Sequence, residues 1–256
     1  MSEELKEELS LLPKGLLHLE AGIQSLREPV LEKSRRMGKL SDALDGLRFL
    51  CALPNMETHA DLIAGLPLYH LHEIFEDVRT LAGYAAGEIQ LESLKLLPGT
   101  EMRRRAEELG IKYSPLPPYE VLQTHEISVS ELQTARQLSR LLDGFYNTPA
   151  WQALTRELIL NDEQFLHRFL AYLTKANLID QPMSLEKRGL ILYEFCKQNY
   201  PEYQIQAAIA WIEAGMSLKK TPCRESMDQT TNPSCHLEYH LWRIQRKPSS
   251  VFPSCR

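Results

Sequence analysis

The sequence predicts an α/β protein in which a small parallel sheet is followed by a helical region. Before residue 110, three short apolar or alternating segments each end in a turn and lead into a longer helical pattern. After residue 130, apolar residues recur at helical spacing only. Strands that alternate with helices in this way form parallel sheets with right-handed crossovers.

The length and composition of the chain are typical of a globular protein. The chain has 256 residues, 43% hydrophobic and 25% charged, which is enough for one large or two modest domains. A net charge of -5 gives no general attraction to nucleic acid or to anionic membranes, so we expect neither partner. Because no apolar run approaches the ~20 residues that span a bilayer, and the acidic opening MSEE does not resemble a signal peptide, we expect a cytoplasmic protein.

The first βα unit begins with a strand predicted at residues 16–24, which turns at Ser25. A helix follows in which Pro29 suits the first turn, because the N-H that proline lacks is unpaired there in any helix. A second helix is predicted from the Ser41 cap. Its apolar residues share one face: Leu44, Leu47, Leu50 and Cys51.

Two more units follow. The second strand is predicted at residues 56–64, is closed by the Gly-Leu-Pro turn at 65–67, and precedes a helix that reaches Leu81. The third strand is predicted at residues 88–96. Its helix spans residues 101–109 and ends at glycine 110, in the position where a left-handed residue caps a helix.

Parallel strands end at one edge of their sheet, and ligands bind at that edge in barrels and open sheets alike. One face of the predicted strands is polar. It carries His18, Glu20, Gly22 and Gln24, then Glu57, His59, Asp61 and Ile63, and more weakly Gln90, Glu92 and Leu94. With helices on the apolar face, this pattern favours an interior that holds a ligand. A polar face that is simply solvated is the alternative.

Three units cannot close a barrel, so the first strand has an unpaired edge unless another chain supplies a neighbour. We therefore expect the chain to be truncated. Residues 114–118 form a proline-rich linker, and 119–129 an irregular or extended segment. Five helices are predicted next, at residues 130–145, 149–160, 163–176, 184–199 and 202–214.

The domain boundaries follow from these elements. We predict a βα domain over residues 1–113, a helical domain over 114–215 and a poorly ordered tail over 216–256.

Five motifs resemble one known family. LEAGIQS at residues 19–25 and HADLIAGLP at 59–67 resemble the fourth and fifth strands of radical S-adenosylmethionine (SAM) enzymes, and LKLLPGT at 94–100 resembles the sixth. YSPLPPYEVL at 113–122 and FYNT at 145–148 resemble the helical C-terminal domain of unknown function of cobalamin-binding radical SAM proteins. The likeness covers residues 8 to 159, in the right order and spacing, and weakens beyond them.

The resemblance implies a partial (β/α) radical SAM barrel, TIM-like, made of the last three βα units. It also implies a SAM site. Gln24 and Ser25 would lie near the methionine or ribose, and Asp61 would accept hydrogen bonds from the ribose hydroxyls.

The implied adenine slot is formed by Ile63 and Gly65, and Leu96 would close it. Glu20 and His59 point into the barrel, where they contact substrate or SAM or serve as satisfied interior polar groups. The hypothesis requires Gln24, Asp61 and Ile63 to line one hollow at the carboxyl ends of adjacent parallel strands.

The sequence departs from the family at the iron-sulfur cluster. Radical SAM enzymes hold a [4Fe-4S] cluster with a C-x-x-x-C-x-x-C loop, whereas the five cysteines of this chain are scattered and include no such spacing. The N-terminal cobalamin domain of the family is also absent, and Leu26 and Arg27 replace small polar residues that often follow Gln-Ser. Without a cluster, we do not expect this polypeptide alone to catalyse radical chemistry.

Two functions remain open. The chain is either a piece of a radical SAM enzyme, whose partner is an upstream-encoded polypeptide with the cobalamin domain and cluster loop, or a degenerate non-enzymatic remnant or interaction module that works through its helical domain. A phosphate-binding barrel fragment is disfavoured because there is no glycine-rich phosphate loop. The sequence does not specify a substrate.

Other motifs favour ordinary roles. A tail zinc site at Cys223, Cys235, His236 and His240 lacks the close cysteine pair of finger sites, so we expect solvated residues. The basic run at 103–105 is interpreted as an exposed helix face rather than a phosphate clamp. Trp151 and Trp211 are expected to be helix-packing anchors.

Overall fold

The computed structural model describes residues 1–84, 86–216, 220 and 222. The chain divides into two compact units, Met1–Gln181 and Pro182–Arg256, which are taken separately below. The sequence-predicted boundary between residues 113 and 114 lies inside the first unit.

The first unit contains a three-stranded sheet with the order β1-β2-β3. The strands are β1 (His18–Gln24), β2 (Glu57–Ala64) and β3 (Glu88–Ser93), and both pairings are parallel, as predicted. Within the described residues these strands form an open sheet, and the barrel implied by the family resemblance is not shown.

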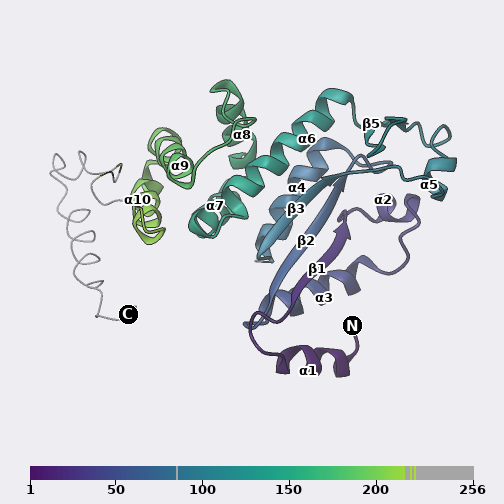
Figure 1. Cartoon of the computed structure of the whole chain (residues 1–256), viewed down its shortest axis with the longest axis horizontal. Helices are drawn as coiled ribbons and strands as arrows, with labels where there is room; N and C mark the ends of the chain where they lie inside the picture. The colour runs from purple at the N-terminus through teal and green to yellow at the C-terminus, as the bar shows by residue number, and fades with distance from the viewer. Residues whose placement is uncertain (85, 217–219, 221, 223–256) are drawn as a thin grey trace, which may run out of the picture. The chain divides into compact units, whose positions relative to one another are not determined.

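Helices cover one face of the sheet. Between β1 and β2 the chain forms α2 (Glu28–Lys33) and α3 (Leu40–Ala52), and between β2 and β3 it forms α4 (Leu71–Gly83). Figure 1 shows α3 and α4 behind the strands. α3 starts one residue before the predicted Ser41, with Lys39 as its N-cap.

Burial along β2 separates the two faces of the sheet. Ala60 and Leu62 are 0% exposed, whereas Asp61 and Ile63 are half-buried. The same alternation holds in β3, where Ile89 is 0% exposed. The predicted division into an apolar and a polar face is therefore confirmed, and the helices pack on the apolar face.

The third strand is shorter than predicted. β3 ends at Ser93 rather than at residue 96, because Lys95 forms an antiparallel bridge with Glu120 and the Leu96 N-H donates to the Tyr119 carbonyl at 2.8 Å. The predicted extended segment supplies these partners.

Two short strands and a short helix follow β3. β4 (Lys112–Tyr113) and β5 (Val121–Gln123) pair antiparallel. The helix predicted at 101–109 is also shorter: α5 spans Glu101–Arg104 and turns follow as far as Gly110, whose φ of +64° is the predicted left-handed residue.

An N-terminal helix, α1 (Glu3–Leu11), was not predicted. Ser2 caps it by accepting the Leu5 N-H at 3.3 Å, and the acidic residues Glu3 and Glu4 in its first turn suit the positive end of the helix dipole. At its other end, the Asn55 side chain donates to the Leu9 and Leu12 carbonyls at 3.0 and 2.8 Å.

The helical region begins within the first unit. α6 (Val129–Leu141) starts at a Ser128 capping box, one residue before the prediction, and continues into the π-helical turn η1 (Leu142–Tyr146). α7 (Pro149–Asn161) and α8 (Phe165–Lys175) follow. Trp151 is 0% exposed, which confirms its predicted packing role.

Side chains from the segment that runs from η1 into α7 bond to the backbone at the start of β3. The Asn147 carboxamide accepts the Ile89 N-H at 2.9 Å and donates to the Ile89 carbonyl at 3.0 Å, as a neighbouring strand would. The Tyr146 hydroxyl donates to the Ala86 carbonyl at 3.0 Å, and Gln152 donates to the Gly87 carbonyl. The FYNT motif therefore joins the helices to the edge of the sheet.

The second unit contains α9 (Leu185–Asn199), the 3-10 turn η2 (Pro201–Tyr203) and α10 (Gln204–Glu213). The Gln204 amide donates to the Tyr193 hydroxyl at 2.6 Å, and Trp211 is 0% exposed, as predicted. The suggested zinc ligands, Cys223, Cys235, His236 and His240, lie outside the described residues, as does most of the predicted tail. No helix in the described parts of the chain has the length and apolar character needed to cross a membrane.

Candidate functional site

The candidate site lies on the polar face, where three strands run side by side. Asp61 of β2 is paired with Gly22 of β1 on one side and with Gln90 of β3 on the other. Residues paired across adjacent strands project from the same face, so Glu20 and His59 share this face with them. Ile63, two residues after Asp61, also shares it. The structure thus brings Glu20, His59, Asp61 and Ile63 together.

Asp61 has the most distinctive environment of this group. Its Oδ1 atom is buried and accepts no hydrogen bond from any residue that the structure describes. Burial raises the pKa of the Asp61 carboxyl; Glu20 and Glu92 also raise it, while His59 opposes them. A buried carboxylate oxygen without a donor is costly in a folded protein, which makes Asp61 the first residue of this face to consider as a candidate for ligand binding.

The β1 side of Asp61 is formed by a glycine. A Cβ atom on Gly22 would lie 2.7 Å from Gln24 Nε2 and 3.6 Å from Arg36 Nη2, so the Gln24 carboxamide folds back over Gly22 and Arg36 reaches the same place. Arg36 also donates to the Gly22 carbonyl. Gln24 can turn in this way because it ends β1 with a φ of +71°, beside a register shift.

The amino-terminal half of the face is an imidazole and carboxylate network. His59 is 8% exposed, and its Nδ1 atom forms a hydrogen bond with Gln90 Nε2 at 2.8 Å. Its Nε2 atom contacts the ring of His18 and lies 3.0 Å from the Glu88 carboxylate. His59 is therefore held by protein partners, which corresponds to the satisfied polar group that the sequence left open. Glu20 is exposed beside it.

Ser25 faces away from this surface. It is 0% exposed, and its hydroxyl donates to Asp77 of α4 at 3.4 Å. Asp77, 1% exposed, also accepts the Tyr69 hydroxyl at 2.6 Å, the Leu26 N-H at 2.8 Å and Arg27 Nε at 3.0 Å. Burial raises the pKa of the Asp77 carboxyl, and the bonds from Tyr69, Leu26 and Arg27 act in the opposite direction.

Asp77 therefore anchors the turn that follows Gln24. Sequence reasoning missed this residue, although a carboxylate between Phe75 and Val78 on the apolar stripe of α4 was the available signal. Arg27, noted only as a departure from the family, is the cation that pairs with it, at 2.9 Å from Nη2.

Two predicted adenine-slot residues contact the segment after β3. Gly65 has a φ of +93°, and a Cβ there would lie 3.3 Å from Val121 and 3.6 Å from Leu132. The positive φ favours glycine here, and a Cβ would in addition make a tight contact with Val121. Leu96 is 1% exposed and lies where the chain pairs with Tyr119.

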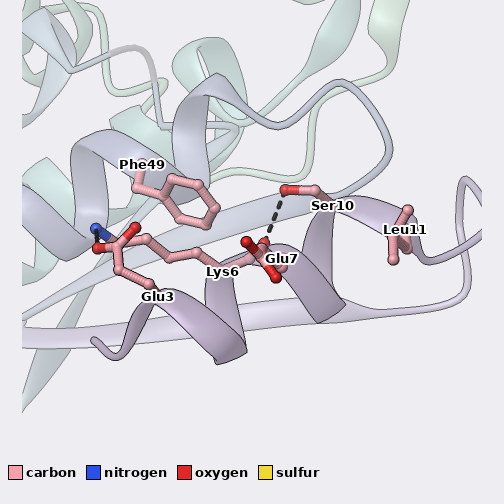
Figure 2. Close-up of a pocket in the computed structure, with 6 residues that line it drawn as sticks. All are labelled: Glu3, Lys6, Glu7, Ser10, Leu11 and Phe49. Atoms are coloured by element: carbon pink, nitrogen blue, oxygen red, sulfur yellow. Dashed lines mark hydrogen bonds and ion pairs between the residues drawn. The ribbon is translucent and has the colours of Figure 1, made fainter.

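A hollow elsewhere on the first unit has none of these residues in its lining. It measures about 590 Å³ and lies between α1 and Phe49 of α3 (Figure 2). Lys6 pairs with Glu3 at 2.8 Å and lies 5.6 Å from the centre of the Phe49 ring, so its charge is already partnered. This hollow reflects how α1 packs and suggests no chemistry.

The described cysteines do not form a cluster site. Cys51 on α3 and Cys196 on α9 are free thiols, and burial raises the pKa of both, that of Cys196 to about 12. Among the residues that the structure describes, no group of three or more His, Cys, Asp or Glu side chains is arranged to hold a metal ion.

Replacing Asp61 with asparagine is expected to stabilise the protein at neutral pH by about 1 kcal/mol or less. The pKa of Asp61 is raised in the folded state, so the protonated carboxyl adds to the free energy of unfolding. This stabilisation is complete below the ordinary aspartate pKa of about 3.9 and is lost as the pH rises through the folded-state pKa. The gain should therefore appear at pH 7 and vanish near pH 3 in urea unfolding curves.

Glu57→Gln is the matched control, since Glu57 is an exposed carboxylate on the same strand. We expect it to change stability by less than about 0.5 kcal/mol. A loss of stability in Asp61→Asn at pH 7 would show that both Asp61 oxygens are well partnered.

Comparison with protein families gives a match to part of the chain. Residues 107–214 match a family described as a protein of unknown function (DUF4080). The match runs from the end of the α5 turns to the end of α10 and excludes the three-stranded sheet. No curated protein matches the chain.

Proposed function

We propose that this chain contributes the ribose- and adenine-binding half of a radical SAM site, and that polypeptide outside these 256 residues supplies the cluster ligands. The observation that carries the proposal is the buried, unpartnered Oδ1 of Asp61 at the centre of a parallel sheet. A ribose presents two adjacent hydroxyl donors, which are the groups that a single carboxylate can accept together.

The surroundings of Asp61 suit a nucleoside. Gly22 has no side chain, which lets the Gln24 carboxamide lie over it on the β1 side of the carboxylate. Gln24, folded over Gly22, offers an amide that can both donate and accept. Ile63 provides an apolar, half-buried surface two residues beyond Asp61, suitable for one side of an adenine ring.

The described residues suit one of the two ligands of a radical SAM site, SAM, but not the other, the [4Fe-4S] cluster. For SAM, the acceptor, the glycine and the apolar residue are present on one face. For the [4Fe-4S] cluster, the described thiols Cys51 and Cys196 have raised pKa values and no cluster spacing, so they do not fit it. A reduced cluster that binds SAM supplies the electron for radical chemistry; the residues here bind and orient the nucleoside.

Two further features support the proposal. Within the described residues β1 pairs with β2 alone, which leaves one side of β1 for a strand from elsewhere. The family match at 107–214 covers nearly all of the predicted helical domain, the part that resembles the C-terminal domain of cobalamin-binding radical SAM proteins. By the same resemblance, the proposal includes cobalamin as a cofactor of the complete assembly.

The proposal is tested by titrating adenosine, 2′-deoxyadenosine and SAM into the full chain, with ligand-observed NMR as the readout. We expect Asp61→Asn to weaken adenosine binding about tenfold, the cost of losing hydrogen bonds to a charged acceptor. 2′-Deoxyadenosine should bind the native chain more weakly and respond less to the substitution, because it lacks one of the donors.

Glu57→Gln should leave adenosine binding unchanged. Adenosine that fails to bind at millimolar concentration, or that binds native and Asp61→Asn chains equally, would contradict the ribose assignment. Anaerobic reconstitution with iron and sulfide tests the rest: we expect little iron in the isolated chain and stoichiometric iron only with a polypeptide that carries C-x-x-x-C-x-x-C.

A further inference from the structure

A second hollow lies beside the β4-β5 pair, away from the polar face of the three-stranded sheet. Its volume is about 760 Å³, within the size range of small-molecule sites. The side chains that matter for its chemistry are Arg103, Arg104, Glu107, Lys112, Tyr113 and His125. Three of them are basic side chains and one is a carboxylate, a local reversal in a chain whose net charge is -5.

Arg103 is held rigidly at this hollow. Its guanidinium lies 5.0 Å from the ring centre of Tyr113 and 4.6 Å from that of Tyr119, and Nη1 donates to the Leu96 carbonyl at 3.0 Å. The remaining Nε and Nη2 donors lie on the other edge of the guanidinium. A planar guanidinium fixed in this way offers two parallel donors to an oxyanion at little cost in side-chain entropy.

Arg104 and Lys112 add charge that the described part of the protein does not neutralise. Neither forms an ion pair with a residue that the structure describes, and Arg104 donates only to the Gly99 carbonyl, at 3.0 Å. Arg105 differs, because it pairs with Glu108 at 2.8 Å and lies 3.7 Å from Glu101. The basic run therefore differs from the exposed helix face that was predicted for it: Arg105 follows α5 and is ion-paired, whereas Arg103 and Arg104 line the hollow.

From these contacts we propose that the hollow binds a phosphate-bearing small molecule of about nucleotide size. The phosphate would sit between the free edge of Arg103, Arg104 and Lys112. Three cations against the single carboxylate of Glu107 favour a multiply charged phosphate over a monocarboxylate. The inference does not depend on the SAM proposal, since the two sites share no side chain that contacts ligand.

Calorimetric titration of pyrophosphate, adenosine monophosphate and succinate into the full chain at low salt tests this inference. We expect saturable binding of both phosphates and weaker binding of succinate. The double variant Arg104→Gln/Lys112→Gln should weaken pyrophosphate binding about tenfold, because two charge-assisted contacts are lost.

The matched control is Arg105→Gln/Lys95→Gln, which removes the same charge outside the hollow and should change the dissociation constant less than about twofold. Arg103→Lys keeps the charge but removes the fork and should weaken binding about tenfold, with a thermal melt to verify folding. Absence of saturable phosphate binding, tighter binding of succinate, or an equal effect of the control double variant would each overturn the proposal.

Discussion

Replacing Asp77 with alanine is expected to lower the free energy of unfolding by about 3 to 5 kcal/mol, the cost of removing one partner from a buried ion pair. Asp77 is 1% exposed, and its loss would leave the buried Tyr69 hydroxyl and the Leu26 N-H without their acceptor. Arg27 would lose the carboxylate that accepts from two of its nitrogens, at 3.0 and 2.9 Å.

Urea unfolding of the full chain, followed by circular dichroism, measures this effect. Glu76→Ala is the matched control, because Glu76 is the adjacent residue, pairs with the same Arg27 at 2.7 Å and is 61% exposed at its side chain. We expect it to cost less than about 1 kcal/mol. Equal losses in the two variants would show that Asp77 matters only as one more charge near Arg27.

Replacing Asn147 with alanine is expected to cost about 2 to 4 kcal/mol, from two backbone groups left without partners at a part-buried edge. The Ile89 N-H and carbonyl both bond to the Asn147 side chain, at 2.9 and 3.0 Å. Because Ile89 is 0% exposed, water would not readily replace the two lost hydrogen bonds.

Asn147→Asp separates the two bonds. The carboxylate still accepts the Ile89 N-H but places a charge against the Ile89 carbonyl, so this variant should also be destabilised in urea unfolding. Gln133→Ala, an exposed amide on α6, should change stability by less than about 0.5 kcal/mol. If Asn147→Ala has the same free energy of unfolding as the native chain, β3 is held by its strand pairing and core contacts alone.

The parallel strands and their two faces were predictable because a period of two and the βα order are local properties of the chain. Asp61 and Ile63 were placed on one face by alternation alone, and the structure agrees. Predicted strand ends were less reliable: the third strand was extended to residue 96, because the sequence gives no sign that Lys95 pairs with Glu120 instead.

The groups that sequence reasoning missed act across long separations. Ser25 follows the predicted Gln24, but its partner Asp77 is 52 residues away, and nothing in the local pattern indicates which carboxylate it meets. Asn147 was recognised as part of a motif, yet its contact with Ile89 spans 58 residues. Arg103 and Arg105 are two residues apart and lie in different environments, a distinction that a run of identical letters cannot show.

The side chain of Asn147 makes the β3 edge of the sheet harder to extend with another strand than the β1 edge. It occupies the hydrogen-bonding groups of Ile89, near the start of β3, so a strand that paired there would have to displace a side chain that already supplies both bonds. At β1, on the other side of the sheet, Arg36 donates to one backbone group, the Gly22 carbonyl. A strand added beside Gly22 of β1 would therefore displace one side-chain bond, whereas a strand added at Ile89 of β3 would displace two.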